Sequence, residues 1–217
     1  MAPPEPNAGD KAPPEYYDLV DRATLATARP LNRWIHSVVP APYNGSATPS
    51  ADADPSPVPN ILTLISLVIG IVAAAVVARK GPRSAAGALF MLAYFFDCAD
   101  GQYARMYNSA TTLGDKLDHY GDVLKWLLMG PALVYASGVG WAAYASHRRW
   151  TLLVVAVTLA YTLSGMGCLQ KYARSKDSNR APEMLDGLIP ICIDWAPPCT
   201  GGVLFALVSG LIATDRL

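Results

Sequence analysis

The sequence from Asp97 to Asp122 reads DCADGQYARMYNSATTLGDKLDHYGD and lies between two apolar stretches. It contains five aspartates, although charged residues make up only 16% of the 217-residue chain. A charged side chain costs about 2.5–3.5 kcal/mol at the centre of a bilayer. If the flanking segments cross a membrane, this concentration of negative charge therefore has to be compensated by cations.

The composition favours a membrane protein. Hydrophobic residues reach 52% and the mean hydropathy is +0.24, which is high for a soluble globular protein. Lys+Arg and Asp+Glu both number 17, so the charge balance indicates no nucleic-acid partner. The four cysteines lack CxxC spacing, which argues against a zinc site or a disulfide framework and leaves a Cys192–Cys199 pair as the remaining option.

Strongly apolar segments occupy most of the chain after its first quarter. They cover residues 60–79, 84–107, 116–141, 150–170 and 199–214. The first and fourth carry no interior charge and are long enough to span about 30 Å of hydrocarbon. Residues 188–198 are a candidate re-entrant helix. The sequence therefore predicts an all-α fold, a polytopic membrane helix bundle with five or six transmembrane helices.

The polar N-terminal part divides into three pieces. Residues 1–14 contain five prolines and are predicted to be a disordered tail. Residues 15–39 are predicted to form an amphipathic interfacial helix, and residues 40–59 a Pro-rich linker. The transmembrane domain then covers residues 60–217.

The interfacial helix is predicted from a helical repeat of apolar side chains. Leu31, Trp34, Ile35 and Val38 share one face, and Pro30 is expected near the start of the helix. Such a helix either lies in the plane of the lipid headgroups or packs on the protein surface.

Basic residues set the predicted orientation in the membrane. One face of the predicted bundle carries nine of them and the opposite face five. The nine are Lys11, Arg22, Arg29, Arg33, Arg105, Lys171, Arg174, Lys176 and Arg180; the five are Arg79, Lys80, Arg83, Arg148 and Arg149. The excess places the aspartates on the cytosolic side, of the endoplasmic reticulum in a eukaryote or of the plasma membrane in a bacterium.

Four of the aspartates are predicted to converge. Asp97 and Asp100 share a face at the end of one helix, and Asp118 and Asp122 share a face near the start of the next. Carboxylates without accompanying Cys or His pairs favour Mg²⁺, with Mn²⁺ as an alternative, and four of them suit two ions about 3.5–4 Å apart. The competing interpretation is a solvated turn whose aspartates face water. Asp115 lies in the first turn of the second helix, where its negative charge interacts favourably with the helix dipole, so it is not predicted to bind metal.

Small residues beside the aspartates suggest space for a ligand. Gly101 and Ala104 open a groove for a base or a phosphate, and Arg105 is placed to pair with a phosphate or with the aspartates. Gly114 lets the chain enter the next helix.

Together these residues form the pattern D-x2-D-G-x2-A-R-x8-G-x3-D-x3-D, which resembles the signature of the CDP-alcohol phosphotransferase family at all eight positions. The resemblance covers roughly residues 30–214. It implies six spans after an amphipathic helix, from which the short C-terminal part departs. Asn60 and Thr63 resemble residues that approach the cytidine nucleotide in this family, although Asn60 also suits a helix N-cap.

The resemblance implies a reaction. The diphosphate of a CDP-alcohol bridges two Mg²⁺ ions, an acceptor hydroxyl attacks the β-phosphorus, and CMP leaves. It also implies that Asp97, Asp100 and Asp118 are metal ligands and that Asp122 is either a ligand or the base.

His119 bears on the identity of the acceptor. The D-H-x2-D sequence from Asp118 to Asp122 resembles the choline/ethanolamine branch, which implies diacylglycerol as acceptor and His119 as the base. The alternative for His119 is that it only orients Asp118. The alternative function is a phosphatidyltransferase that joins CDP-diacylglycerol to a polar acceptor.

Two other classes remain open from the sequence, a divalent-cation transporter and a scaffold with a lapsed site. The basic stretch 170–180 suits either phosphate binding or a positively charged flank of a span. Expected partners are a CDP-alcohol, a lipid or alcohol acceptor and membrane lipid. The resemblance also allows a homodimer.

Overall fold

The computed structural model describes residues 17–39, 56–107, 109–137, 168 and 202–213. All regular structure in this part is α-helical, as predicted. The helices are α1 (Leu19–Val38), α2 (Val58–Ala78), α3 (Arg83–Met106), α4 (Thr112–Ser137) and α6 (Gly202–Ala213).

Helix α2 agrees with the first predicted span. In the described residues it is the one helix that is both long and apolar enough to cross a membrane. Helices α3 and α4 have 24 and 26 residues but include the aspartates, and α6 has only 12 residues. The predicted span 150–170, apart from residue 168, and the candidate re-entrant helix 188–198 lie outside the described residues. The number of spans therefore stays a prediction.

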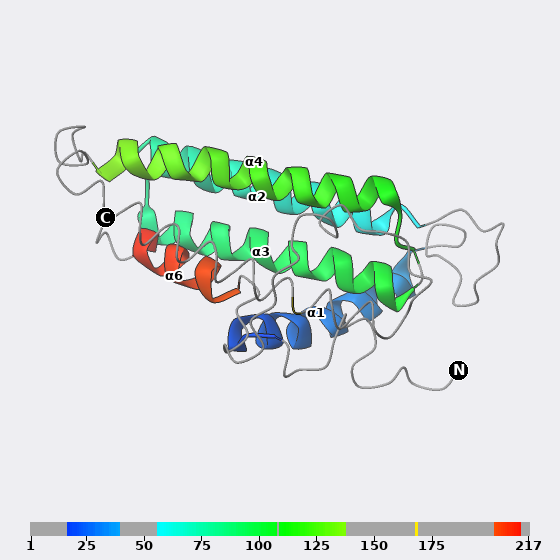
Figure 1. Ribbon diagram of the computed structural model, residues 1–217. Coiled ribbons are helices and arrows are strands. Elements are labelled where there is room, and N and C mark those ends of the chain that lie inside the picture. Colours follow the sequence, from blue (N-terminus) through cyan, green and yellow to red (C-terminus); the bar gives the residue numbers. More distant parts are fainter. Residues whose placement is uncertain (1–16, 40–55, 108, 138–167, 169–201, 214–217) are drawn as a thin grey trace.

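Helix α3 is the centre of the packing. It packs against α2, α6 and α1, and α2 packs in turn against α4, so that α2 and α4 lie on one side of α3 and α1 and α6 on the other (Figure 1). The core between these helices is aromatic near α6: the Phe205 ring lies 5.1 Å from that of Phe90, 4.5 Å from that of Tyr94 and 4.9 Å from that of Trp126. Small residues of α2, among them Ala73 and Ala74, allow the close approach of its neighbours.

Helix α1 lies within the predicted range 15–39 but does not start near Pro30. Asp18 caps its N-terminus by accepting hydrogen bonds from the backbone N–H groups of Val20 and Asp21, at 3.0 and 2.9 Å. Pro30 therefore lies inside the helix, and its predicted place near the start was wrong. An interior proline costs about 3 kcal/mol, more than one N-cap contributes, so the packing of α1 against α3 and α6 keeps the helix continuous.

Helix α1 has one face buried on protein and one face exposed. Asn32 is fully buried against α3 and donates from its side chain to the carbonyl oxygen of Ala99 at 2.9 Å. Gln102 of α3 donates back to the carbonyl oxygen of Leu25 at 3.1 Å. Trp34 and Val38, in contrast, are 61% and 56% exposed. One face of α1 thus packs on protein and the other carries apolar side chains that suit a membrane surface.

Cys168 differs from the prediction, because it is disulfide-bonded. Cys98 is free, and the predicted pair Cys192–Cys199 lies outside the described residues.

Two carboxylates join α1 to the start of α6. Asp18 accepts a hydrogen bond from the backbone N–H of Val203 at 3.2 Å. A Cβ added at Gly202 would lie 2.6 Å from Oδ1 of Asp21, so only glycine allows this approach. Burial, and after it the negative charge of Asp18, raises the pKa of Asp21 from 3.8 to about 8.

We expect Asp21→Asn to stabilise the protein in a pH-dependent way. Because the folded-state pKa of Asp21 is raised from 3.8 to about 8, the folded protein loses stability as the pH rises through this window. The amide cannot ionise, so the stability gained over wild type should grow from about pH 4 to about pH 8 and then level off. Thermal unfolding of the detergent-solubilised protein across this range measures the gain. A gain that is the same at every pH would contradict the buried-acid account.

Candidate functional site

Three aspartates from two helices form one acidic cluster. Asp97 of α3 and Asp118 and Asp122 of α4 each offer a carboxylate oxygen, and these three atoms lie within 4.8 Å of one another. One oxygen of Asp118, Oδ1, is buried without a hydrogen-bond partner. Carboxylate oxygens are the ligands that hard divalent cations prefer. The donor set and the unpartnered oxygen therefore fit a divalent cation such as Mg²⁺, and the solvated-turn interpretation does not account for either.

Asp100 lies next to this cluster but has a partner of its own. Its carboxylate is 3% exposed and accepts a hydrogen bond from the Thr63 hydroxyl of α2 at 2.5 Å. The same hydroxyl lies 3.1 Å from the carbonyl oxygen of Pro59. Thr63, which the sequence associates with the nucleotide, thus holds a carboxylate of the predicted metal site in place.

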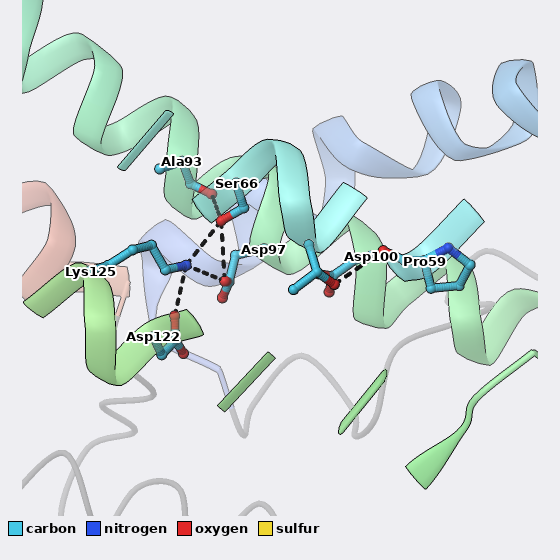
Figure 2. Close-up of polar contacts among 8 residues, drawn as sticks. Pro59, Ser66, Ala93, Asp97, Asp100, Asp122 and Lys125 are labelled. Carbon is cyan, nitrogen blue, oxygen red and sulfur yellow. Dashed lines mark hydrogen bonds and ion pairs between the residues drawn. The ribbon is translucent and has the colours of Figure 1, made fainter. Parts of the chain in front are cut away.

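Lys125 is the site residue that the sequence reasoning missed. Its ammonium lies 2.5 Å from Oδ1 of Asp97, 2.8 Å from Oδ1 of Asp122 and 2.9 Å from Oγ of Ser66 (Figure 2). The side chain is only 1% exposed. A signal was present in the sequence, because Lys125 interrupts an apolar run three residues after Asp122 and so shares its helix face.

One ammonium compensates only part of the negative charge. Asp97, Asp100, Asp118 and Asp122 contribute four carboxylates, against the single ammonium of Lys125 in their midst. If all are ionised, a formal charge of −3 remains, which is expensive in an apolar environment. Bound cations would neutralise this excess of negative charge.

Two glycines permit close approaches at the edge of the site. A Cβ at Gly114 would lie 2.8 Å from Oδ1 of Asn60 and 3.1 Å from the hydroxyl oxygen of Thr111. A Cβ at Gly101 would lie 3.1 Å from the guanidinium of Arg105, whose side chain is exposed.

Two further predicted site residues lie beside these glycines: Asn60 contacts Gly114 from α2, and Ala104 follows Gly101 on α3. Asn60 is the third residue of α2, whose N-cap is Pro57, so the N-cap alternative for Asn60 was wrong. Ala104 is partly buried one turn after Gly101, and its carbonyl oxygen accepts from the backbone N–H of Ser109 at 2.9 Å. The carbonyl of Ala104 thus helps to close α3 before the chain turns into α4.

His119 lies on α4 beside the acidic cluster but outside it. Its Nδ1 is 2.7 Å from the backbone carbonyl oxygen of Asp115 and 3.4 Å from Oδ1 of that residue. A carbonyl oxygen accepts only, so Nδ1 carries the proton, and in the neutral ring Nε2 keeps the lone pair that a base needs. The contacts of Nδ1 are with Asp115, which does not support the alternative that His119 orients Asp118.

We expect Gly114→Ala to destabilise the protein by about 1–3 kcal/mol, the usual cost of overpacking. The added methyl group would press on the side chain of Asn60. The matched control is Gly130→Ala on the same helix, where a Cβ meets nothing within 4 Å. This control should be neutral or gain up to about 1 kcal/mol from helix propensity. Thermal unfolding measures both variants, and equal effects would contradict the close packing of Gly114.

The chain matches a model of a known protein family. Residues 57–211 match a family model described as CDP-alcohol phosphatidyltransferase, and this range includes all eight residues of the aspartate pattern. A search of curated proteins finds no match.

Proposed function

The chain belongs to the CDP-alcohol phosphatidyltransferase family, and on this premise we propose that it moves a substituted phosphate from a CDP-alcohol to an acceptor hydroxyl and releases CMP. Members of the family are integral membrane transferases of phospholipid biosynthesis that use divalent metals. The observation that carries the proposal is the acidic cluster of Asp97, Asp118 and Asp122, which the α3–α4 pair assembles from residues of the family pattern. The transporter and scaffold alternatives lose their support, because the family consists of enzymes.

The proposed metal ligands are Asp97, Asp100, Asp118 and Asp122. When bound, two Mg²⁺ ions, with Mn²⁺ as the alternative, would neutralise the diphosphate and stabilise the departing CMP. Four carboxylates provide enough oxygen ligands for two such ions. The hydrogen bond from Thr63 keeps one oxygen of Asp100 in place and so prepares its other oxygen for a ligand role.

The substrate phosphates and nucleotide are proposed to bind at the glycine-lined edge of the site. Arg105 lies over Gly101 and carries a guanidinium that can form two parallel hydrogen bonds with a phosphate. Asn60 packs on Gly114 and offers an amide to the nucleotide. Ala104 provides a small surface in the same turn of α3.

His119 is proposed as the base that accepts the proton of the acceptor hydroxyl. Because Nδ1 is engaged with the carbonyl of Asp115, the proton would go to Nε2. The alternative base is Asp122. With His119 as base, diacylglycerol is the favoured acceptor; with Asp122, a polar acceptor and CDP-diacylglycerol are favoured.

The proposed setting is a multi-pass membrane protein with the site on the cytosolic face. The exposed Trp34 and Val38 of α1 would lie in the headgroup layer, where a lipid acceptor enters. A homodimer remains an alternative to a single chain. The membrane would be that of the endoplasmic reticulum in a eukaryote and the plasma membrane in a bacterium.

We expect Asp97→Asn and Asp118→Asn each to lower CMP release by at least about 100-fold while the protein still inserts into membranes. Each change removes a charged oxygen ligand from the acidic cluster. The assay is Mg²⁺-dependent CMP release from CDP-choline, CDP-ethanolamine or CDP-diacylglycerol, each combined with candidate acceptors. Asp21→Asn, between α1 and α6, is the matched control and should keep wild-type turnover at neutral pH. Near-normal turnover in either cluster variant would contradict the proposed metal site.

We expect His119→Ala to lower turnover by about 10²–10⁴-fold, the usual contribution of a general base. Binding of the CDP-alcohol should survive, since the aspartates remain. Turnover and nucleotide binding are measured separately, beside Asp122→Asn. If His119→Ala keeps most activity while Asp122→Asn loses it, the base is Asp122 and polar acceptors take precedence over diacylglycerol.

A further inference from the structure

The stem of Lys125 passes through a gap that one glycine provides. A Cβ added at Gly70 of α2 would lie 2.7 Å from Cγ and 2.9 Å from Cδ of Lys125. Any larger residue at Gly70 would therefore have to displace the lysine. Helix α2 is apolar and α4 packs directly against it. A lysine in such an interface is expensive unless its ammonium finds oxygen partners.

The ammonium finds three such partners. Two are the Oδ1 atoms of Asp97 and Asp122, and the third is the hydroxyl oxygen of Ser66 at 2.9 Å. The Ser66 hydroxyl donates its own proton to the carbonyl oxygen of Ala93 at 2.8 Å, so its lone pairs face the ammonium. An ammonium has three protons, and each has an oxygen within reach.

Both carboxylates that Lys125 contacts belong to the acidic cluster. Asp118, the third member, lies on the same helix as Lys125 but has no ion pair with it in the described residues. A divalent ion on this cluster would therefore share two of its ligands with a fixed positive charge. Like charges that share ligands weaken each other's binding.

We propose that Lys125 is a resident counter-ion that competes with divalent cations for Asp97 and Asp122 and so sets the metal affinity of the site. It keeps the acidic cluster folded before metal arrives, and it weakens metal binding enough for exchange. This inference rests on the metal-binding part of the proposed function. It does not depend on which acceptor the enzyme uses.

The test compares the metal affinity of Lys125→Met with that of the wild type. The full-length protein in detergent is stripped with chelator and titrated with Mn²⁺, and thermal unfolding reports the half-saturating concentration. A charge within about 4–6 Å changes the proton affinity of a carboxylate by about 10- to 1000-fold, so we expect Lys125→Met to bind Mn²⁺ about tenfold more tightly or better. Without metal the variant should unfold at a lower temperature than the wild type, and saturating Mn²⁺ should close most of this gap.

Three further variants separate charge from packing. Lys116→Met removes an exposed lysine from the same helix and should leave both readouts unchanged. Lys125→Arg keeps the charge and should keep the half-saturating concentration near that of the wild type. Lys125→Gln removes the charge but retains hydrogen bonding, and should tighten Mn²⁺ binding as Lys125→Met does.

The outcomes distinguish this inference from the proposed function. Unchanged or weaker Mn²⁺ binding in the Met and Gln variants of Lys125 overturns the inference, even if the wild type releases CMP from a CDP-alcohol. Tighter binding without any CMP release supports the inference and overturns the function. If the wild type gains no stability from Mn²⁺, or if neither neutral variant folds even with saturating metal, competition by Lys125 is overturned.

Discussion

The ion pairs of Lys125 with Asp97 and Asp122 are the interaction on which the rest of the site depends. They join α3 to α4 inside an apolar bundle, where neither charge would be tolerated alone. Ser66 completes the arrangement from α2, so three helices contribute to one buried polar network. Because carboxylates still outnumber the ammonium, the network holds the site together and remains attractive to added cations.

The bundle makes room for these polar groups by having glycine at the positions that they approach. Gly70 makes space for the stem of Lys125, and Gly114 makes space for the amide of Asn60. A third glycine, Gly202, lets two carboxylates of α1 reach the start of α6. In each case a missing Cβ makes room for a polar side chain from another segment of the chain. These glycines therefore matter because they lack a side chain and so allow close contacts between helices.

Helix α3 connects the polar site to the rest of the molecule. At one end its Phe90 and Tyr94 pack on Phe205 of α6. Near the other end, the carbonyl of Ala99, one residue before Asp100, accepts from Asn32 of α1. Helix α1 is therefore held by hydrogen bonds to the same segment that presents the aspartates.

The sequence by itself determined the helices and the set of aspartates. A long apolar run is enough to place α2, and the spacing of Asp118 and Asp122 is enough to put them on one face, because both follow from local helix geometry. Only the tertiary structure decided which partners these groups have: Asp100 with Thr63, and Lys125 with the two carboxylates beside it. Such pairings depend on how close two helices approach, and this distance is set by small residues such as Gly70, which lies 55 positions before the lysine it accommodates. Local spacing carries no information about contacts over that separation.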